Sequence, residues 1–139
     1  MKAMLFGTFD LLHPGHKNLF RQAKKYADHV IVVVARDKTV QELKKRKPAH
    51  DEKKRLAAVK ECGLVDEFRL GSLNDKYAAI KKYKPDLILL GYDQKFLIEG
   101  LSEKLRELGL GKTGIIRLKP YKPSIYKSSK IRKNRIRNF

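Results

Sequence analysis

The chain of 139 residues has 33 lysines and arginines against 15 acidic residues, giving a formal net charge of +18, and 42% of its residues are hydrophobic. This length suits one domain with one core, and the hydrophobic content excludes an intrinsically disordered chain. No apolar run approaches the roughly 20 residues of a membrane helix, and the N-terminus lacks the features of a signal peptide. We therefore predict a single cytoplasmic domain, residues 1–139, with no membrane partner.

The charge favours polyanionic ligands, whether nucleic acid, an anionic membrane or polyphosphate, and by itself does not choose among them. Cys62 is the only cysteine. A disulfide within the chain is therefore excluded, in agreement with a reducing compartment.

The first predicted elements alternate between strand and helix. Residues 2–6 form a short apolar run that ends at Gly7, as a buried strand does. Apolar residues at helical spacing then predict a helix over 15–26. Residues 29–35 are apolar and β-branched, typical of a parallel strand that is covered on both faces. Residues 36–50 are polar and basic, and no element is predicted there.

A second helix is predicted to begin after Asp51, which can cap it, and to end at Gly63. Its inward face is expected to carry Leu56, Ala57 and Val59. A weak strand follows. The sequence predicts this weak strand over 67–70, a short helix over 75–83 and a buried strand over 86–90. It then predicts a helix over 96–108, a last strand over 115–118 and a final helix over 128–137.

This alternation predicts an α/β fold, a doubly wound (Rossmann-like), five-stranded parallel sheet with helices on both faces. Ligands of such sheets bind at the carboxyl ends of strands, where the direction of winding reverses. The loops after Phe6 and after Leu90 are therefore the predicted binding region.

The segment between the first strand and the first helix reads G-T-F-D-L-L-H-P-G-H, residues 7–16. Gly7 allows a tight turn and a close approach of a ligand to the backbone. Gly15 and His16 open the helix, whose free N–H groups favour phosphate. His13 and His16 can both reach the same space and donate hydrogen bonds to triphosphate oxygens, more strongly as negative charge builds up on them.

This segment resembles the H-x-G-H signature of the cytidylyltransferase-like nucleotidyltransferases. Two further segments keep the order of that family: L-G-Y-D-Q at 90–94, which matches its G-x-D element, and Y-K-S-S-K-I at 126–131, which stands where the family has I-S-T-T-x-I. Taken alone, the first is an ordinary strand end with a capping Asp, and the second an ordinary Ser N-cap. The resemblance covers nearly the whole chain and implies transfer of a nucleoside monophosphate onto a phosphate-bearing acceptor, with release of pyrophosphate.

Within the family the chain looks closest to the archaeal FAD synthases, which are FMN adenylyltransferases. It shares their G-T-F-D-x-L-H-P-G-H run, the V-A-R-D at 34–37, L-G-x-D-Q and a terminal S-S-x-I. It lacks the R-T-E-G and G-D-D-W stretches of the cytidylyltransferase branch, which argues against cytosine as the base and glycerol phosphate as the acceptor. The resemblance therefore implies ATP and FMN as substrates.

The resemblance also implies the site. His13 and His16 are the expected catalytic residues. A divalent cation, expected to be Mg²⁺, accompanies the triphosphate. No side chain is predicted to ligate a metal. A homodimer is common in the family. The residues expected to bind the nucleotide are Thr8, Phe9, His13, Pro14, Gly15, His16, Asp93, Tyr121, Ser128 and Ser129.

A basic cluster lies next to this site in the sequence, and one of its lysines is expected to reach the triphosphate. Its members are Arg36, Lys44, Lys45, Arg46, Lys47 and Arg55. Three other functions remain to be compared. CTP with a small phosphorylated alcohol such as glycerol 3-phosphate is the alternative within the family. A basic nucleic-acid-binding module is the alternative of another class, although no nucleic-acid partner is expected. A dinucleotide-binding oxidoreductase is set aside because the first loop lacks G-x-G-x-x-G.

Overall fold

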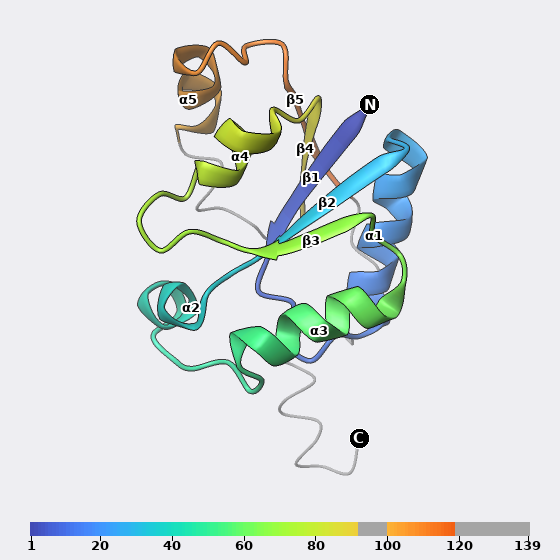
Figure 1. Ribbon diagram of the computed structural model, residues 1–139, viewed down its shortest axis with the longest axis vertical. Coiled ribbons are helices and arrows are strands. Elements are labelled where there is room, and N and C mark those ends of the chain that lie inside the picture. The colour runs from blue at the N-terminus through green and yellow to red at the C-terminus, as the bar shows by residue number, and fades with distance from the viewer. Residues whose placement is uncertain (92–99, 119–139) are drawn as a thin grey trace.

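The computed structural model describes residues 1–91 and 100–118, and the structural statements below concern these residues. Strands and helices alternate along this part of the chain, except that two helices lie between the second and third strands (Figure 1). In order they are β1 (Lys2–Gly7), α1 (Pro14–Tyr26), β2 (His29–Val34), α2 (Asp37–Lys44), α3 (Glu52–Cys62), β3 (Glu67–Leu70), α4 (Ala78–Tyr83), β4 (Leu87–Leu90), α5 (Leu101–Glu107) and β5 (Gly114–Arg117).

The five strands form one parallel sheet in the order β3-β2-β1-β4-β5. The chain winds outward from β1 through β2 to β3, and then returns to the other side of β1 with β4 and β5. The winding therefore reverses between β1 and β4, which pair from Ala3 with Leu87 to Leu5 with Leu89. The carboxyl ends of these two strands are neighbours, and the predicted fold class and position of the reversal are both confirmed.

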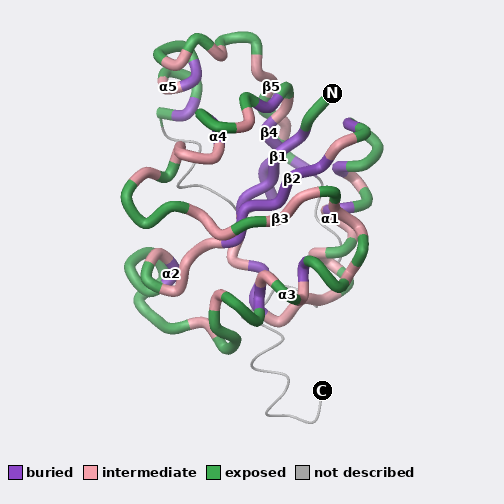
Figure 2. Tube along the Cα trace, viewed as in Figure 1, coloured by how far each residue is buried: buried purple, intermediate pink, exposed green. Residues whose placement is uncertain are grey.

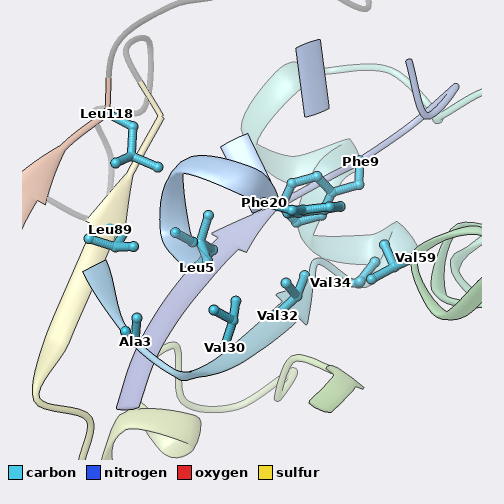
Figure 3. Close-up of a cluster of buried hydrophobic side chains, with 12 residues drawn as sticks. Ala3, Leu5, Phe9, Phe20, Val30, Val32, Val34, Val59, Leu89 and Leu118 are labelled. Carbon is cyan, nitrogen blue, oxygen red and sulfur yellow. The ribbon is translucent and has the colours of Figure 1, made fainter. Parts of the chain in front are cut away.

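Successive residues of each strand face opposite sides of the sheet, so the sheet has a hydrophobic core on each face. On one face, α1 contributes Phe20 and α3 contributes Val59. On the other, α4 contributes Ile80 and α5 contributes Leu101. Burial is concentrated along β1 and β2, while the outer sides of the helices are exposed (Figure 2). Figure 3 shows the first core, in which the rings of Phe9 and Phe20 lie together and Val59 lies beside Val34.

The ends of α3 were predicted correctly. The Asp51 side chain accepts a hydrogen bond of 2.8 Å from the backbone N–H of Lys54, and Gly63 ends the helix in the left-handed region with φ 68°. The predicted inward face is partly wrong, because Ala57 is exposed. Arg55 is buried with Val59 instead, four residues apart on the same face of the helix.

Two further predictions are corrected by the structure. Helix α2 lies in the segment 36–50, where none was predicted; Val40 is its only buried residue, so no apolar periodicity marks it. Helix α4 begins at Ala78 rather than at residue 75, because the Asp75 carboxylate accepts the backbone N–H of Tyr77 and forms a turn. The first residues of the predicted helix 96–108 and the whole of the helix 128–137 lie outside the described residues.

Replacing Gly63 with alanine is expected to lower the free energy of unfolding by about 1 kcal/mol, because a Cβ is disfavoured at a left-handed residue. Gly111→Ala is the matched control: its φ is not positive and a Cβ there would meet only Arg106 Cγ at 3.6 Å. Urea unfolding followed by circular dichroism measures both. Equal losses for the two variants would contradict the role of the left-handed cap.

Candidate nucleotide-binding site

The loop from Gly7 to His13 leaves the central strand β1 at the winding reversal and enters α1. It contains two residues other than glycine in the left-handed region, Phe9 with φ 52° and Leu11 with φ 53°. Backbone in this region costs energy for a residue with a Cβ and persists where the surroundings hold it. In this loop the surroundings include the core on one side and buried polar contacts on the other.

His13 is the N-cap of α1, with Pro14 at the first helical position. Its Nδ1 accepts a hydrogen bond of 3.0 Å from the backbone N–H of Gly15. An imidazole nitrogen that accepts an N–H carries no proton, so the proton of the neutral ring is on Nε2. The cap therefore fixes both the orientation of the ring and the tautomer that makes Nε2 a donor.

His16 lies one turn further, where its ring stacks on that of His13 with centroids 3.8 Å apart and planes inclined by 24°. The Phe9 ring meets His16 edge-on at 5.4 Å and packs against Phe20 at 5.3 Å. His16 Nδ1 is buried and has no hydrogen-bond partner among the described residues. Because an unsatisfied buried polar atom costs roughly 1–3 kcal/mol, this nitrogen is suited to meet a ligand atom.

Burial lowers the pKa of His13 to about 4. Burial also lowers the pKa of His16 to about 3, with smaller contributions from the positive charges of His13 and Lys44 and an opposing one from Asp10. Both rings are therefore neutral at pH 7. Two neutral rings can stack at 3.8 Å, whereas two imidazolium ions at that distance would repel each other.

These pKa values predict a pH dependence of stability. Both histidines ionise near pH 6.5 in the unfolded chain and only near 4 and 3 in the folded one, so unfolding takes up protons between these limits. The contribution of the two histidines to the free energy of unfolding is thus fully present above pH 6.5 and is lost as the pH falls toward 4 and below. The slope of this loss corresponds to the uptake of about one to two protons on unfolding. Hydrogen bonds to lysines lower the pKa values of Asp66 and Asp75. Protonation of these carboxylates therefore affects the unfolding free energy only at lower pH.

Urea titrations at pH 7.5, 6.5, 5.5 and 4.5 measure this slope, and His16→Ala should reduce it by about one proton. An unfolding free energy that is constant between pH 7.5 and 4.5 would contradict the burial of neutral imidazoles.

The residues predicted to bind the nucleotide divide into three groups. His13, Pro14, Gly15 and His16 lie together at the start of α1. Thr8 and Phe9 precede them, but the Phe9 ring is in the core, so only the backbone of Phe9 is left to face a nucleotide. Asp93, Tyr121, Ser128 and Ser129 lie outside the described residues.

The basic cluster divides in the same way. Arg36 binds Glu52 at 2.8 Å and the carbonyl of Gly71, and Arg55 is buried, so both are structural. Three of the other members, Lys44, Arg46 and Lys47, line a shallow hollow together with Thr8, Asp10, Val40 and Pro48. Lys44 and Lys47, two candidates for the one lysine predicted to reach the triphosphate, thus lie beside the loop that carries the histidines.

The sequence predicted no role for Asp10 and placed Arg55 only in the basic cluster, whereas the two residues are 4% and 0% exposed. Asp10 accepts the backbone N–H groups of Ala49 and His50 at 2.7 and 3.0 Å. Arg55 donates to the carbonyls of Thr8 and His50 and to the carboxylate of Asp37. Its spacing from Val59 was the available signal, since residues four apart share a helix face.

Within residues 1–91 and 100–118, the structure has no group of three or more His, Cys, Asp or Glu side chains that could hold a metal ion. Asp10, which precedes the histidines, uses both carboxylate oxygens on backbone N–H groups. The described residues thus do not form a metal site of their own.

No helix in this part of the chain is long and apolar enough to cross a membrane.

A family model described as cytidylyltransferase-like matches residues 4–134, nearly the whole chain. The chain belongs to the cytidylyltransferase-like family.

Among its relatives is a protein of Aciduliprofundum boonei named FAD synthase, which is 43% identical over 87% of this chain and 80% of the relative. Another FAD synthase, from Methanohalophilus mahii, is also 43% identical, over 90% of this chain and 87% of the relative. A crystal structure described as a lipopolysaccharide core biosynthesis protein from Thermoplasma volcanium superposes with a TM-score of 0.81 at 40% identity, covering 87% of this chain and 98% of that one. These relatives confirm the resemblance predicted from the sequence.

Proposed function

We propose that the protein is an FMN adenylyltransferase, which transfers AMP from ATP to FMN and yields FAD and pyrophosphate. The observation that carries the proposal is the pair of stacked imidazoles, with ring centroids 3.8 Å apart, at the start of α1 and at the winding reversal of the sheet. The relatives named FAD synthase support the choice of adenine nucleotide and flavin acceptor.

In the proposed reaction, a phosphate oxygen of FMN attacks the α-phosphorus of ATP in line, and the bond to the β-phosphate breaks. The acceptor is already anionic at neutral pH, so no covalent enzyme intermediate and no general base are required. The protein's contribution is to position the two phosphates and to stabilise charge on the leaving pyrophosphate.

The two histidines perform this stabilisation as neutral donors. His13 offers Nε2–H, since its Nδ1 is held by the Gly15 N–H. His16 adds a second ring in the same place, and the positive end of the α1 helix dipole favours an anion there. Because negative charge grows on the leaving group in the transition state, these hydrogen bonds strengthen there more than in the ground state.

Lys44 is the lysine that we assign to the triphosphate. It ends α2, lines the hollow beside Thr8 and is close enough to His16 for its charge to lower the pKa of that ring. Arg46 and Lys47 line the same hollow and would complete the neutralisation of the phosphates. In this proposal Asp93 holds the ribose, Tyr121 stacks on an aromatic ring, and Ser128 and Ser129 bind phosphate.

A divalent cation, Mg²⁺ by expectation, belongs to the proposal as a companion of the triphosphate. Since the described residues do not form a metal site, the cation would be held by the phosphate oxygens of ATP. It would neutralise part of the phosphate charge. The homodimer and the cytoplasmic location stay predictions.

The test is an end-point assay of purified protein with each of the four nucleoside triphosphates, Mg²⁺, and either FMN or glycerol 3-phosphate. Pyrophosphate and FAD should form in equal amounts with ATP and FMN. Pyrophosphate release only with CTP and glycerol 3-phosphate would favour the cytidylyltransferase alternative. Absence of pyrophosphate in every mixture, together with tight and strongly salt-dependent binding of DNA or RNA, would favour a nucleic-acid-binding module and overturn the proposal.

A further inference from the structure

The segment that carries the cations of the proposed triphosphate site is held in place by two buried charges. Residues 45–51 connect α2 to α3 without regular structure of their own, and most of their side chains are exposed. A loop of this kind has few apolar contacts to fix its position. Instead, two side chains, those of Asp10 and Arg55, bind its backbone at His50.

Asp10 and Arg55 bind His50 from both sides of its backbone. The Asp10 carboxylate accepts the N–H of Ala49 at 2.7 Å and that of His50 at 3.0 Å. Arg55 Nε donates to the carbonyl of His50 at 3.0 Å. The position of this residue is thus defined by one acidic and one basic side chain, 4% and 0% exposed.

Arg55 links this point to two other parts of the site. One terminal nitrogen donates to the carbonyl of Thr8 at 2.8 Å, in the loop that leads to the histidines. The other donates to Asp37 at 2.7 Å, at the first residue of α2. Arg55 therefore joins the start of α2 and the backbone of His50 to the loop after β1. Lys44, Arg46 and Lys47 lie between these two points in the sequence.

The burial of Arg55 excludes a direct contact with substrate, so its role must be exerted through these three acceptors. A buried guanidinium is costly to desolvate and is rarely the most stabilising choice for a core position. Its donors do, however, join two backbone carbonyls and the Asp37 carboxylate, groups that cannot bind each other because all of them are acceptors.

We propose that Asp10 and Arg55 form a clasp that positions the cations of the 44–48 segment for the triphosphate of the nucleotide; this inference rests on the proposed function. Both are positioning residues rather than catalytic ones. With the clasp intact, long basic side chains start from a fixed backbone and lose less freedom when they bind phosphate. With the clasp broken, ATP affinity should fall, while FMN affinity and the chemical step should change little.

The test compares Asp10→Asn and Arg55→Lys with Val59→Ala. Asp10→Asn keeps the shape of the side chain but cannot accept two N–H groups with both of its terminal atoms, and Arg55→Lys keeps the charge but loses the fork. Val59 is fully buried four residues along the same helix and contacts the core instead of the basic segment, so its variant reports a general loss of stability. Calorimetry gives the Kd for ATP with Mg²⁺ in the absence of FMN, steady-state assays give kcat and both KM values, and hydrogen exchange reports the amides of Ala49 and His50.

The clasp predicts faster exchange at these two amides in Asp10→Asn. In both clasp variants the Kd and the KM for ATP should rise about tenfold, while the KM for FMN should change by less than about twofold. Val59→Ala should leave all three constants near their wild-type values. Faster exchange with unchanged ATP affinity, or an equal rise in all constants in Val59→Ala, would overturn the proposal. Wild-type protein that binds ATP but makes no FAD would instead refute the proposed acceptor, and the calorimetric comparison would still test the clasp.

Discussion

His16→Ala should lower kcat for FAD formation by roughly 100- to 1,000-fold, the usual effect of removing one preorganised hydrogen-bond donor to developing charge. The His16 ring stacks on His13, and its buried Nδ1 has no hydrogen-bond partner among the described residues. The native fold therefore gains little from this nitrogen. Removing the ring should lower the thermal midpoint by only a few degrees, since the loss of packing is offset by the loss of an unsatisfied buried atom.

The rate is measured as FAD and pyrophosphate formed under saturating substrates, with the folded fraction checked by circular dichroism. Lys17→Gln is the control, because this exposed residue follows His16 directly and makes no contact assigned to the reaction. Its kcat should stay within about twofold of the wild-type value. A His16→Ala protein with the wild-type rate would remove His16 from the mechanism.

Gly7→Ala should lower the free energy of unfolding by about 1–3 kcal/mol, the cost of overpacking a closely filled site. A Cβ at this position would lie 2.7 Å from Phe9 Cζ and 2.9 Å from Phe9 Cε2. The ring has little room to retreat, since it is packed against Phe20 and touches His16 edge-on. Displacing it would therefore also move His16, and kcat should fall with the stability.

A double-mutant cycle with Phe9→Leu tests the cause. The shorter side chain of leucine should relieve the clash, so the double variant should be more stable than the sum of the two single losses predicts. Additive losses would show that the cost of Gly7→Ala arises elsewhere, for example in the turn itself. Unfolding in urea gives all four free energies.

The parts of the fold that sequence predicted well are those with a local signature. The β-branched run of β2 and the alternation of strand and helix each leave a pattern in a window of a few residues. The cap at Asp51 and the stop at Gly63 are equally local. Helix α2 was missed because it is short and polar and buries only Val40, so its stability comes from tertiary contacts that no window reveals.

The same distinction applies to the site. The histidines were found because the loop motif is contiguous and follows the first strand. The contacts of Asp10 with His50 and of Arg55 with Thr8 join residues 40 and 47 positions apart, and their partners are backbone groups that carry no sequence signal. The pKa values of His13 and His16 depend on burial and could not be read from the residue types alone.

The position of Phe9 connects these two levels. Its place in the motif predicts a contact with the nucleotide through the loop, while its ring belongs to the core and supports His16. The left-handed backbone of Phe9 turns this ring inward, and Gly7 leaves the space for it. A motif residue can therefore act by packing, a role that its sequence position does not distinguish from ligand contact.

The most direct test of the account is a crystal structure of the protein with Mg²⁺ and an ATP analogue whose α,β-bridging oxygen is replaced by a methylene group. The account predicts phosphate oxygens within about 3.2 Å of His13 Nε2 and of a ring nitrogen of His16, at the N-terminus of α1. A triphosphate bound elsewhere, with both imidazoles still stacked and in contact with protein atoms alone, would contradict it.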